Sequence, residues 1–219
     1  MKRLTTPTPP KTLPKTDLAD PSKDGVRRAL QDSLQRLRVA LEALDAAAVF
    51  ERPAPEVWSP AEHTLHLITS VNAVAKALTY PRWLLRLRFG KSSGSGSYAE
   101  LVASYQSRLA AGGRAFGRWV PPSEVPADPD AGKALLLARR QRAEQRLMDG
   151  LGGWSEKDLD RLCLPHPLIG KITVREMLFF TRYHNLHHCL RVEERASLEE
   201  PSANASEPVD RRARPVGAA

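Results

Sequence analysis

The sequence predicts an all-α, single-domain protein whose helices pack against one another as a bundle. In several long segments, apolar residues recur at steps of three and four positions, which is the spacing of one face of a helix. Helix start signals precede several of these segments, and nothing alternates convincingly between apolar and polar residues as a strand would. A length of 219 residues suits one ordinary domain with a core of its own.

Two of the expected helices are indicated by periodicity alone. The first carries an apolar stripe formed by Val26, Leu30, Leu34, Leu37, Leu41 and Leu44. Another is supported by Leu135, Leu137, Ala138, Ala143 and Leu147. Clusters of Gly and Pro around residues 52–55, 90–97, 121–130 and 150–154 divide the chain into helical pieces. Several long helices with short connections predict a bundle, and bundle cores often hold metal sites built by facing helices.

Three further helices begin with a capping box, in which a Ser or Thr and a Glu three residues later bond to each other's backbone N–H groups. The boxes are Ser59 with Glu62, Ser97 with Glu100, and Thr173 with Glu176. Pro60 adds a start signal, because proline suits the first helical position. We expect the helix after Ser97 to run to about Trp119 and the last helix to run to about Arg195.

Both ends of the chain are expected to be disordered tails. Residues 1–23 are mainly Pro, Thr, Lys and Asp, and residues 198–219 are mainly Pro, Ser, Ala, Glu and Arg. Neither segment has periodic apolar positions that could pack against a core. Residues 24–197 then form the helical domain.

The chain is expected to be a soluble, cytoplasmic protein. No stretch reaches the roughly 20 apolar residues of a membrane helix, and the N-terminus lacks the apolar region of a signal peptide. An organelle transit peptide is disfavoured because no Arg-rich amphipathic helix opens the chain. Cys163 and Cys189 match no zinc ribbon, and two thiols suit a reducing compartment.

The formal net charge of +8 is concentrated in one region. Between residues 81 and 122, a single acid, Glu100, stands against the basic residues Arg82, Arg86, Arg88, Lys91, Arg108, Arg114 and Arg118. No nucleic-acid-binding motif accompanies them, so binding of DNA or RNA is disfavoured. A solvated surface or a mouth that attracts anions is the favoured interpretation.

The histidines fall in three places along the chain. His63 and His66 lie in the second expected helix, His166 lies in the loop before the last helix, and His184, His187 and His188 lie within the last helix. Residues four positions apart are one helical turn apart, so His184 and His188 suit two imidazoles that reach one ion. By spacing alone His187 is an alternative partner, and histidines that serve the core without a metal are the plainer alternative.

Helical geometry separates His187 from His188. At about 100° per residue, a face with Arg175, Arg182 and Glu193 lies opposite His184 and is expected to face solvent. The inward arc then holds Thr173, Met177, Phe180, His184 and His188, with His187 at its flank beside Tyr183. On the second helix, His66 borders the apolar stripe, and its neighbours Ser70, Ala73 and Ala77 are small enough to leave space for a substrate.

Two segments of the sequence resemble the DinB/YfiT-like family. The start of that family's second helix resembles residues 58–67, WSPAEHTLHL, in which His66 follows Trp58 by eight residues at the position of a metal ligand. Its closing segment resembles residues 165–188, PHPLIGKITVREMLFFTRYHNLHH, with the HxxxH pair His184 and His188. The resemblance covers about residues 24–196. It implies a four-helix bundle with a divalent metal held by His66, His184 and His188.

The resemblance also implies an activity and its cofactors. Across the family the metal is zinc, nickel or iron, and some relatives are transferases that use a low-molecular-weight thiol such as bacillithiol or mycothiol. We therefore expect a metal-dependent transferase or hydrolase that acts on a small molecule. The alternative is a metal-binding protein without catalysis, acting in stress response or as a binding module. A second copy of the chain, in a homodimer, is a further partner to consider.

Other residues are weaker candidates for roles at such a site. Glu62 and His63, one turn before His66, are candidates for a general base or for orienting a ligand, although a cap and a surface position also explain them. His166 is a candidate for covering the site or for a fourth ligand. A loop histidine that bonds to the backbone is the favoured alternative.

The segment 80–89 mixes aromatic residues with Arg82, Arg86 and Arg88. Membrane-surface helices have such a composition, but a segment of about ten residues is better explained as a lid or helix end over the pocket. The three arginines are then candidates for binding an anionic thiol cofactor or an anionic substrate.

Overall fold

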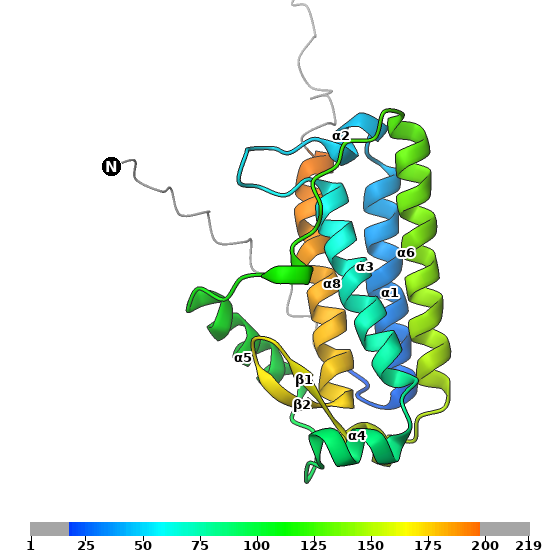
Figure 1. Ribbon diagram of the computed structural model, residues 1–219, viewed down its shortest axis with the longest axis vertical. Helices are drawn as coiled ribbons and strands as arrows, with labels where there is room; N and C mark the ends of the chain where they lie inside the picture. Colours follow the sequence, from blue (N-terminus) through cyan, green and yellow to red (C-terminus); the bar gives the residue numbers. More distant parts are fainter. Residues whose placement is uncertain (1–17, 198–219) are drawn as a thin grey trace, which may run out of the picture.

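Four long helices lie side by side in the computed structural model, which describes residues 18–197 (Figure 1). They are α1 (Lys23–Glu42), α3 (Pro60–Leu78), α6 (Pro129–Gly152) and α8 (Val174–Ser197). The shorter elements are α2 (Ala46–Phe50), α4 (Arg82–Phe89), α5 (Tyr98–Ala110), the 3-10 turn η1 (Gly117–Trp119), α7 (Glu156–Arg161), β1 (Cys163–His166) and β2 (Gly170–Thr173). The predicted all-α four-helix bundle is confirmed.

The bundle is assembled from helix pairs that are distant in sequence. Helix α3 packs along α6, α1 packs along α8, and α8 also contacts α3. The α3–α6 contact is close at Gly150, where an added Cβ would lie 3.2 Å from the Cβ of Leu78. Glycine there lets the two helices approach. The core between the four helices is built mainly from leucine, including the fully buried Leu30, Leu67 and Leu147.

Helix α8 is buried on nearly all of its faces, because 14 of its 24 residues are buried. The predicted solvent face of this helix is therefore wrong. Of the three residues expected on that face, Arg175 is buried and Arg182 and Glu193 are half-buried, and each makes a specific contact. The contacts are with Asp160 and Glu156 for Arg175, with the ring of Tyr98 for Arg182, and with Arg36 for Glu193.

The helix starts follow the sequence signals. All three capping boxes are present, each with both backbone N–H groups bonded. In addition, the Ser22 side chain accepts a hydrogen bond from the Gly25 N–H, so α1 begins at Lys23. Residues 18–23 of the predicted N-terminal tail are thus part of the structure, and Lys23 is the first residue of α1. The rest of both predicted tails, residues 1–17 and 198–219, lies outside the described residues.

The third predicted helix ends earlier than expected, at Ala110 and not near Trp119. Gly112 has φ +91°, a left-handed conformation that turns the chain away from the helix axis. Residues 111–128, which we call the strap, then run without regular structure except for η1. In Figure 1 the green strap rises from α5 past the bundle to the start of α6, and η1 contacts α3.

A short antiparallel hairpin precedes α8, although the sequence predicts no strand. Strand β1 pairs with β2 from Cys163 opposite Thr173 to His166 opposite Gly170. Each strand has four residues, which is too short for an alternating pattern to stand out in the sequence. The hairpin directs the turn between His166 and Gly170 toward the same side of the bundle as the strap, where both line one pocket.

The paired Arg175 allows a test of how α7 is attached to α8. We expect Arg175→Met to lower the free energy of unfolding by about 1–3 kcal/mol in urea titrations, because it leaves the partly exposed carboxylates of α7 without their partner. Arg38→Met, which removes an exposed pair within α1, is the matched control and should change it by less than about 0.5 kcal/mol.

The effect of Arg175→Met should depend on pH. Hydrogen bonds from Arg175 hold the pKa of Asp160 below its ordinary value. The stabilisation is therefore present above about pH 4, near the ordinary pKa of an unfolded aspartate, and is lost as the pH falls through the lowered pKa. A difference between wild type and variant that grew on acidification would contradict this account.

Candidate metal centre and pocket

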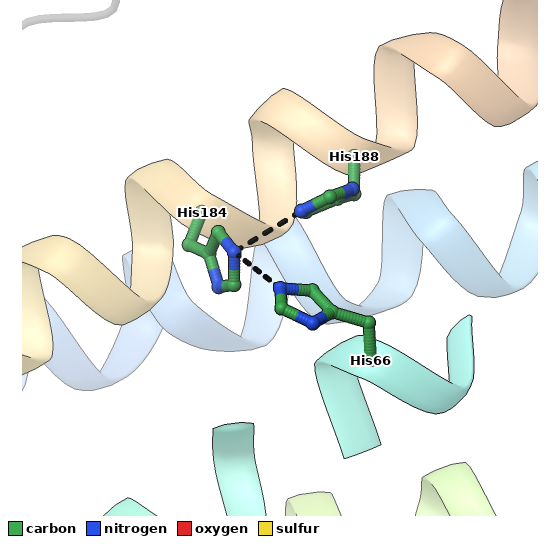
Figure 2. Close-up of side chains that lie close together, drawn as sticks. All are labelled: His66, His184 and His188. Carbon is green, nitrogen blue, oxygen red and sulfur yellow. Dashed lines mark hydrogen bonds between the residues drawn. The ribbon is translucent and has the colours of Figure 1, made fainter. Parts of the chain in front are cut away.

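Three imidazole rings meet between α3 and α8 (Figure 2). The Nε2 atom of His184 lies 3.0 Å from Nε2 of His66 and 3.1 Å from Nε2 of His188. All three residues are buried. Two nitrogens bound to one ion at 2.0–2.1 Å are themselves roughly 3 Å apart, so these spacings fit a shared divalent metal. The structure thus brings together the three histidines that the sequence singled out.

The helices explain why these rings converge. His184 and His188 are one turn apart on α8, and His66 lies in the first half of α3 on the side that contacts α8. Figure 2 shows the two rings of α8 pointing toward the ring from α3. His187 is excluded from the group by its direction, because its ring lies beside Tyr183 at a centroid distance of 6.2 Å. His187 thus lies beside Tyr183 at the flank of the group, as predicted.

Hydrogen bonds to the outer ring nitrogens fix which nitrogen faces the centre. Nδ1 of His66 lies 2.6 Å from the carbonyl oxygen of Trp119 in the strap. A carbonyl only accepts, so Nδ1 of His66 donates and its Nε2 carries the lone pair. Nδ1 of His188 lies 2.8 Å from Nδ1 of His63. If Nε2 of His188 is a ligand, its Nδ1 donates and His63 accepts.

Burial keeps these imidazoles neutral. It is the main cause that lowers the pKa of His184 and of His188 well below the ordinary value, and neighbouring histidines lower both further. Burial also lowers the pKa of His66, against the opposing effect of the Trp119 carbonyl. Metal binding requires unprotonated imidazole nitrogen. The donor set, three neutral imidazoles with their lone pairs directed at one point, therefore fits a divalent metal.

Aromatic rings surround the centre. The ring of Trp58 lies 5.2 Å from that of His66 and 5.5 Å from that of His63, measured between centroids. On the other side, Phe180 stacks on His184 at 4.8 Å. These contacts leave the rings little freedom to rotate away from the centre.

The centre opens into a cavity of about 430 Å³. His66, His184 and His188 line it, together with the hairpin turn and the strap. The small residues Ser70 and Ala73 also line it, as does Ala77, so the predicted space beside His66 is present. A volume of this size suits a small organic molecule.

Glu62 and His63 have different surroundings. Glu62 is buried, accepts a hydrogen bond from the Ser59 N–H at 2.8 Å, and is bound through both carboxylate oxygens by Arg52. Burial raises the pKa of Glu62, but the hydrogen bonds from Arg52 and Ser59 outweigh it, and the net shift is downward. Glu62 does not line the pocket, so the structure favours its capping role. His63 contacts His188 and is placed to orient it.

His166 bonds to the backbone of its own turn. Its Nδ1 accepts from the N–H groups of Leu168 and Ile169, each at 3.2 Å. Its ring packs against Phe180, with the centroids 4.2 Å apart, and lines the pocket. It is outside the three-nitrogen group, and its backbone bonds agree with the favoured alternative of a loop histidine.

The arginines of segment 80–89 lie away from the pocket lining. The Arg82 guanidinium stands 3.9 Å from the centre of the Trp154 ring and donates to the Gly153 carbonyl. Arg86 and Arg88 are exposed on α4. Only the ends of this segment, Tyr80 and Phe89, reach the pocket. The basic side chains that line the pocket are instead those of Lys76, Arg114 and Arg118.

Two further features of the site were not predicted from the sequence. One is the Trp119 carbonyl, a backbone acceptor that any residue type would supply. The other is Lys76, which reaches the pocket from the last turn of α3. Gly112 and Gly113, adjacent in sequence, are the signal by which the strap could have been recognised.

The ligand assignment predicts a clear pattern of metal binding. Single changes of His66, His184 or His188 to Ala should each remove most of the metal measured by mass spectrometry of the purified protein. His187→Ala is the matched control, from the same helix, and should keep a stoichiometric amount. Trp119→Ala should also keep it, because the bond to His66 comes from the backbone. Full metal content in a His66→Ala/His188→Ala double variant would refute the assignment.

No helix among residues 18–197 is long and apolar enough to cross a membrane.

Similarity to known proteins identifies the family of this chain. No curated protein matches the chain. One solved structure, YfiT from Bacillus subtilis, is 17% identical, with a TM-score of 0.49 over 84% of this chain and 91% of its own. It is described as a probable metal-dependent hydrolase with an unusual four-helix bundle topology. The family model of the DinB superfamily matches residues 29–191, and the chain belongs to that superfamily.

Proposed function

We propose that this protein is a divalent-metal-dependent enzyme that converts a small molecule in the pocket beside His66, His184 and His188. The observation that carries the proposal is that three Nε2 atoms converge at the wall of a cavity of about 430 Å³. Structural zinc sites are usually closed by four protein ligands. Here the described residues contribute no fourth Cys, His, Asp or Glu to the group, which is the arrangement of a catalytic site.

The surrounding residues have definable roles in this proposal. The Trp119 carbonyl and His63 hold the rings of His66 and His188 in the direction in which Nε2 is free to bind. Trp58 and Phe180 cover the ring faces and limit the access of water to them. A bound divalent ion would supply an open position and lower the pKa of a coordinated water or thiol, so that neither needs a carboxylate base.

A thiol-dependent transfer is the more specific form of the proposal, with hydrolysis as its nearest relative. No Asp or Glu lines the pocket in the part of the chain that is described. This lining favours a reaction whose nucleophile is activated without a carboxylate. The same observation favours the second candidate, a metal-binding protein without catalysis.

A screen of the metal-loaded protein tests these alternatives. Protein reconstituted with zinc, nickel or iron is assayed with pairs of low-molecular-weight thiols and electrophiles, and separately with esters and amides. We expect turnover that requires metal and that falls more than about 100-fold in His188→Ala. Arg86→Gln, an exposed change outside the pocket, is the control and should retain full activity. Stoichiometric metal without turnover of any substrate would support the non-catalytic candidate.

A further inference from the structure

Every formally charged side chain in the pocket lining is basic. The lining includes Lys76, Arg114 and Arg118, and none of its described residues is an aspartate or a glutamate. We call these three residues the basic rim, because they are exposed whereas the three central histidines are buried. In the described part of the chain, no ion pair joins a rim residue to a carboxylate. Their charge is therefore not compensated by the protein there.

Lys76 is separated from the histidines along the pocket, whereas Arg118 directly precedes Trp119, whose carbonyl contacts His66. Lys76 lies ten residues after His66 on α3, a rise of about 15 Å along the helix. Arg114 and Arg118 come from the strap, and the Arg118 guanidinium lies 4.6 Å from the centre of the Trp119 ring. Apolar residues form much of the remaining lining, among them Ala73, Val74, Leu109, Phe116, Leu168 and Met177. A ligand that reaches from the histidines to Lys76 passes along these apolar walls, which favour an apolar body.

The pocket wall also holds a hydrogen-bond donor, on His166, that has no acceptor among the described residues. His166 is only 8% exposed, and its Nδ1 is occupied as an acceptor from two backbone N–H groups. In the neutral ring the proton must then be on Nε2. Within residues 18–197 no acceptor is bonded to this N–H, although the ring lines the pocket. Because the ring lines the pocket and this N–H has no bonded acceptor there, it favours a ligand that brings an oxygen atom.

We propose that the pocket selects a small organic carboxylate. Its acidic group lies at the basic rim, its apolar body lies along the walls, and a second oxygen accepts a hydrogen bond from Nε2–H of His166. Uncompensated cations beside an apolar cavity attract an anion and disfavour a cationic ligand. The inference rests on the proposed function only in making this anion the substrate, because binding at the rim does not require the metal.

The test compares a carboxylate with a neutral compound of nearly the same shape. 6-Methoxynaphthalene-2-acetate and the corresponding acetamide, which both carry an ether oxygen on the apolar body, are titrated into the metal-free and the zinc-loaded protein by calorimetry. The wild type should bind the carboxylate about tenfold more tightly than the amide in both forms. The triple variant Lys76→Gln/Arg114→Gln/Arg118→Gln should lose this preference. Its metal content and thermal stability should not change, because the rim residues are exposed.

A matched control separates local charge from total charge. Arg86→Gln/Arg88→Gln/Lys91→Gln removes the same number of positive charges from exposed positions outside the lining. This variant should keep the preference for the carboxylate over the amide. A second variant, His166→Phe, keeps a ring against Phe180 and should weaken binding of both compounds about equally. Equal affinity of the wild type for carboxylate and amide would overturn the proposal. So would a preference that appears only with zinc and survives in both triple variants, since the carboxylate would then bind the metal and not the rim.

These binding measurements do not depend on catalysis. A protein that binds no metal but prefers the carboxylate would refute the proposed function and leave this inference standing. A metal-dependent enzyme that treats the two compounds alike would do the reverse.

Discussion

The structure depends on the burial of α8 on almost every side. This helix contacts α1 and α3 along its length and α5 and α7 at its beginning, so its polar residues must find partners inside the protein. Arg175, Arg182 and Glu193 find them on three different helices. His184 and His188 are part of the same buried surface. The central position of α8 is what removes these imidazoles from water and holds them against α3.

Burial has opposite consequences for the fold and for the centre. A neutral imidazole is easier to bury than a charged one, which is why the pKa of His184 is lowered. At the same time, three lone pairs directed at one point are unfavourable unless something binds there. An ion that binds only the folded state would offset this cost and stabilise the bundle in proportion to its free concentration. Affinity at the centre and stability of the bundle are in this way linked.

Local signals allowed most of the helices to be predicted from sequence. The leucine stripe of α1 and the capping boxes of α3, α5 and α8 each depend on residues that are close together in the sequence. The surroundings of α8 could not be predicted, because its partners come from distant segments. Arg36 and Glu193, for example, are 157 positions apart. The three histidines were brought into view by their spacing and by the resemblance, whereas the Trp119 carbonyl has no side-chain signature at all.

That carbonyl has a consequence for how the protein tolerates mutation. A histidine that is oriented by a carboxylate side chain loses that partner when the acidic residue is substituted. His66 is oriented instead by a main-chain carbonyl, which almost every substitution at position 119 preserves. The orientation of His66 is instead sensitive to substitutions that change the backbone path of the strap. Gly112 and Gly117 both have positive φ, and a side chain at either would strain the course that delivers the carbonyl. During evolution, the side chains of this segment, including those that line the pocket, are therefore expected to change freely while its glycines are kept. Specificity could in this way diverge among descendants without loss of the centre.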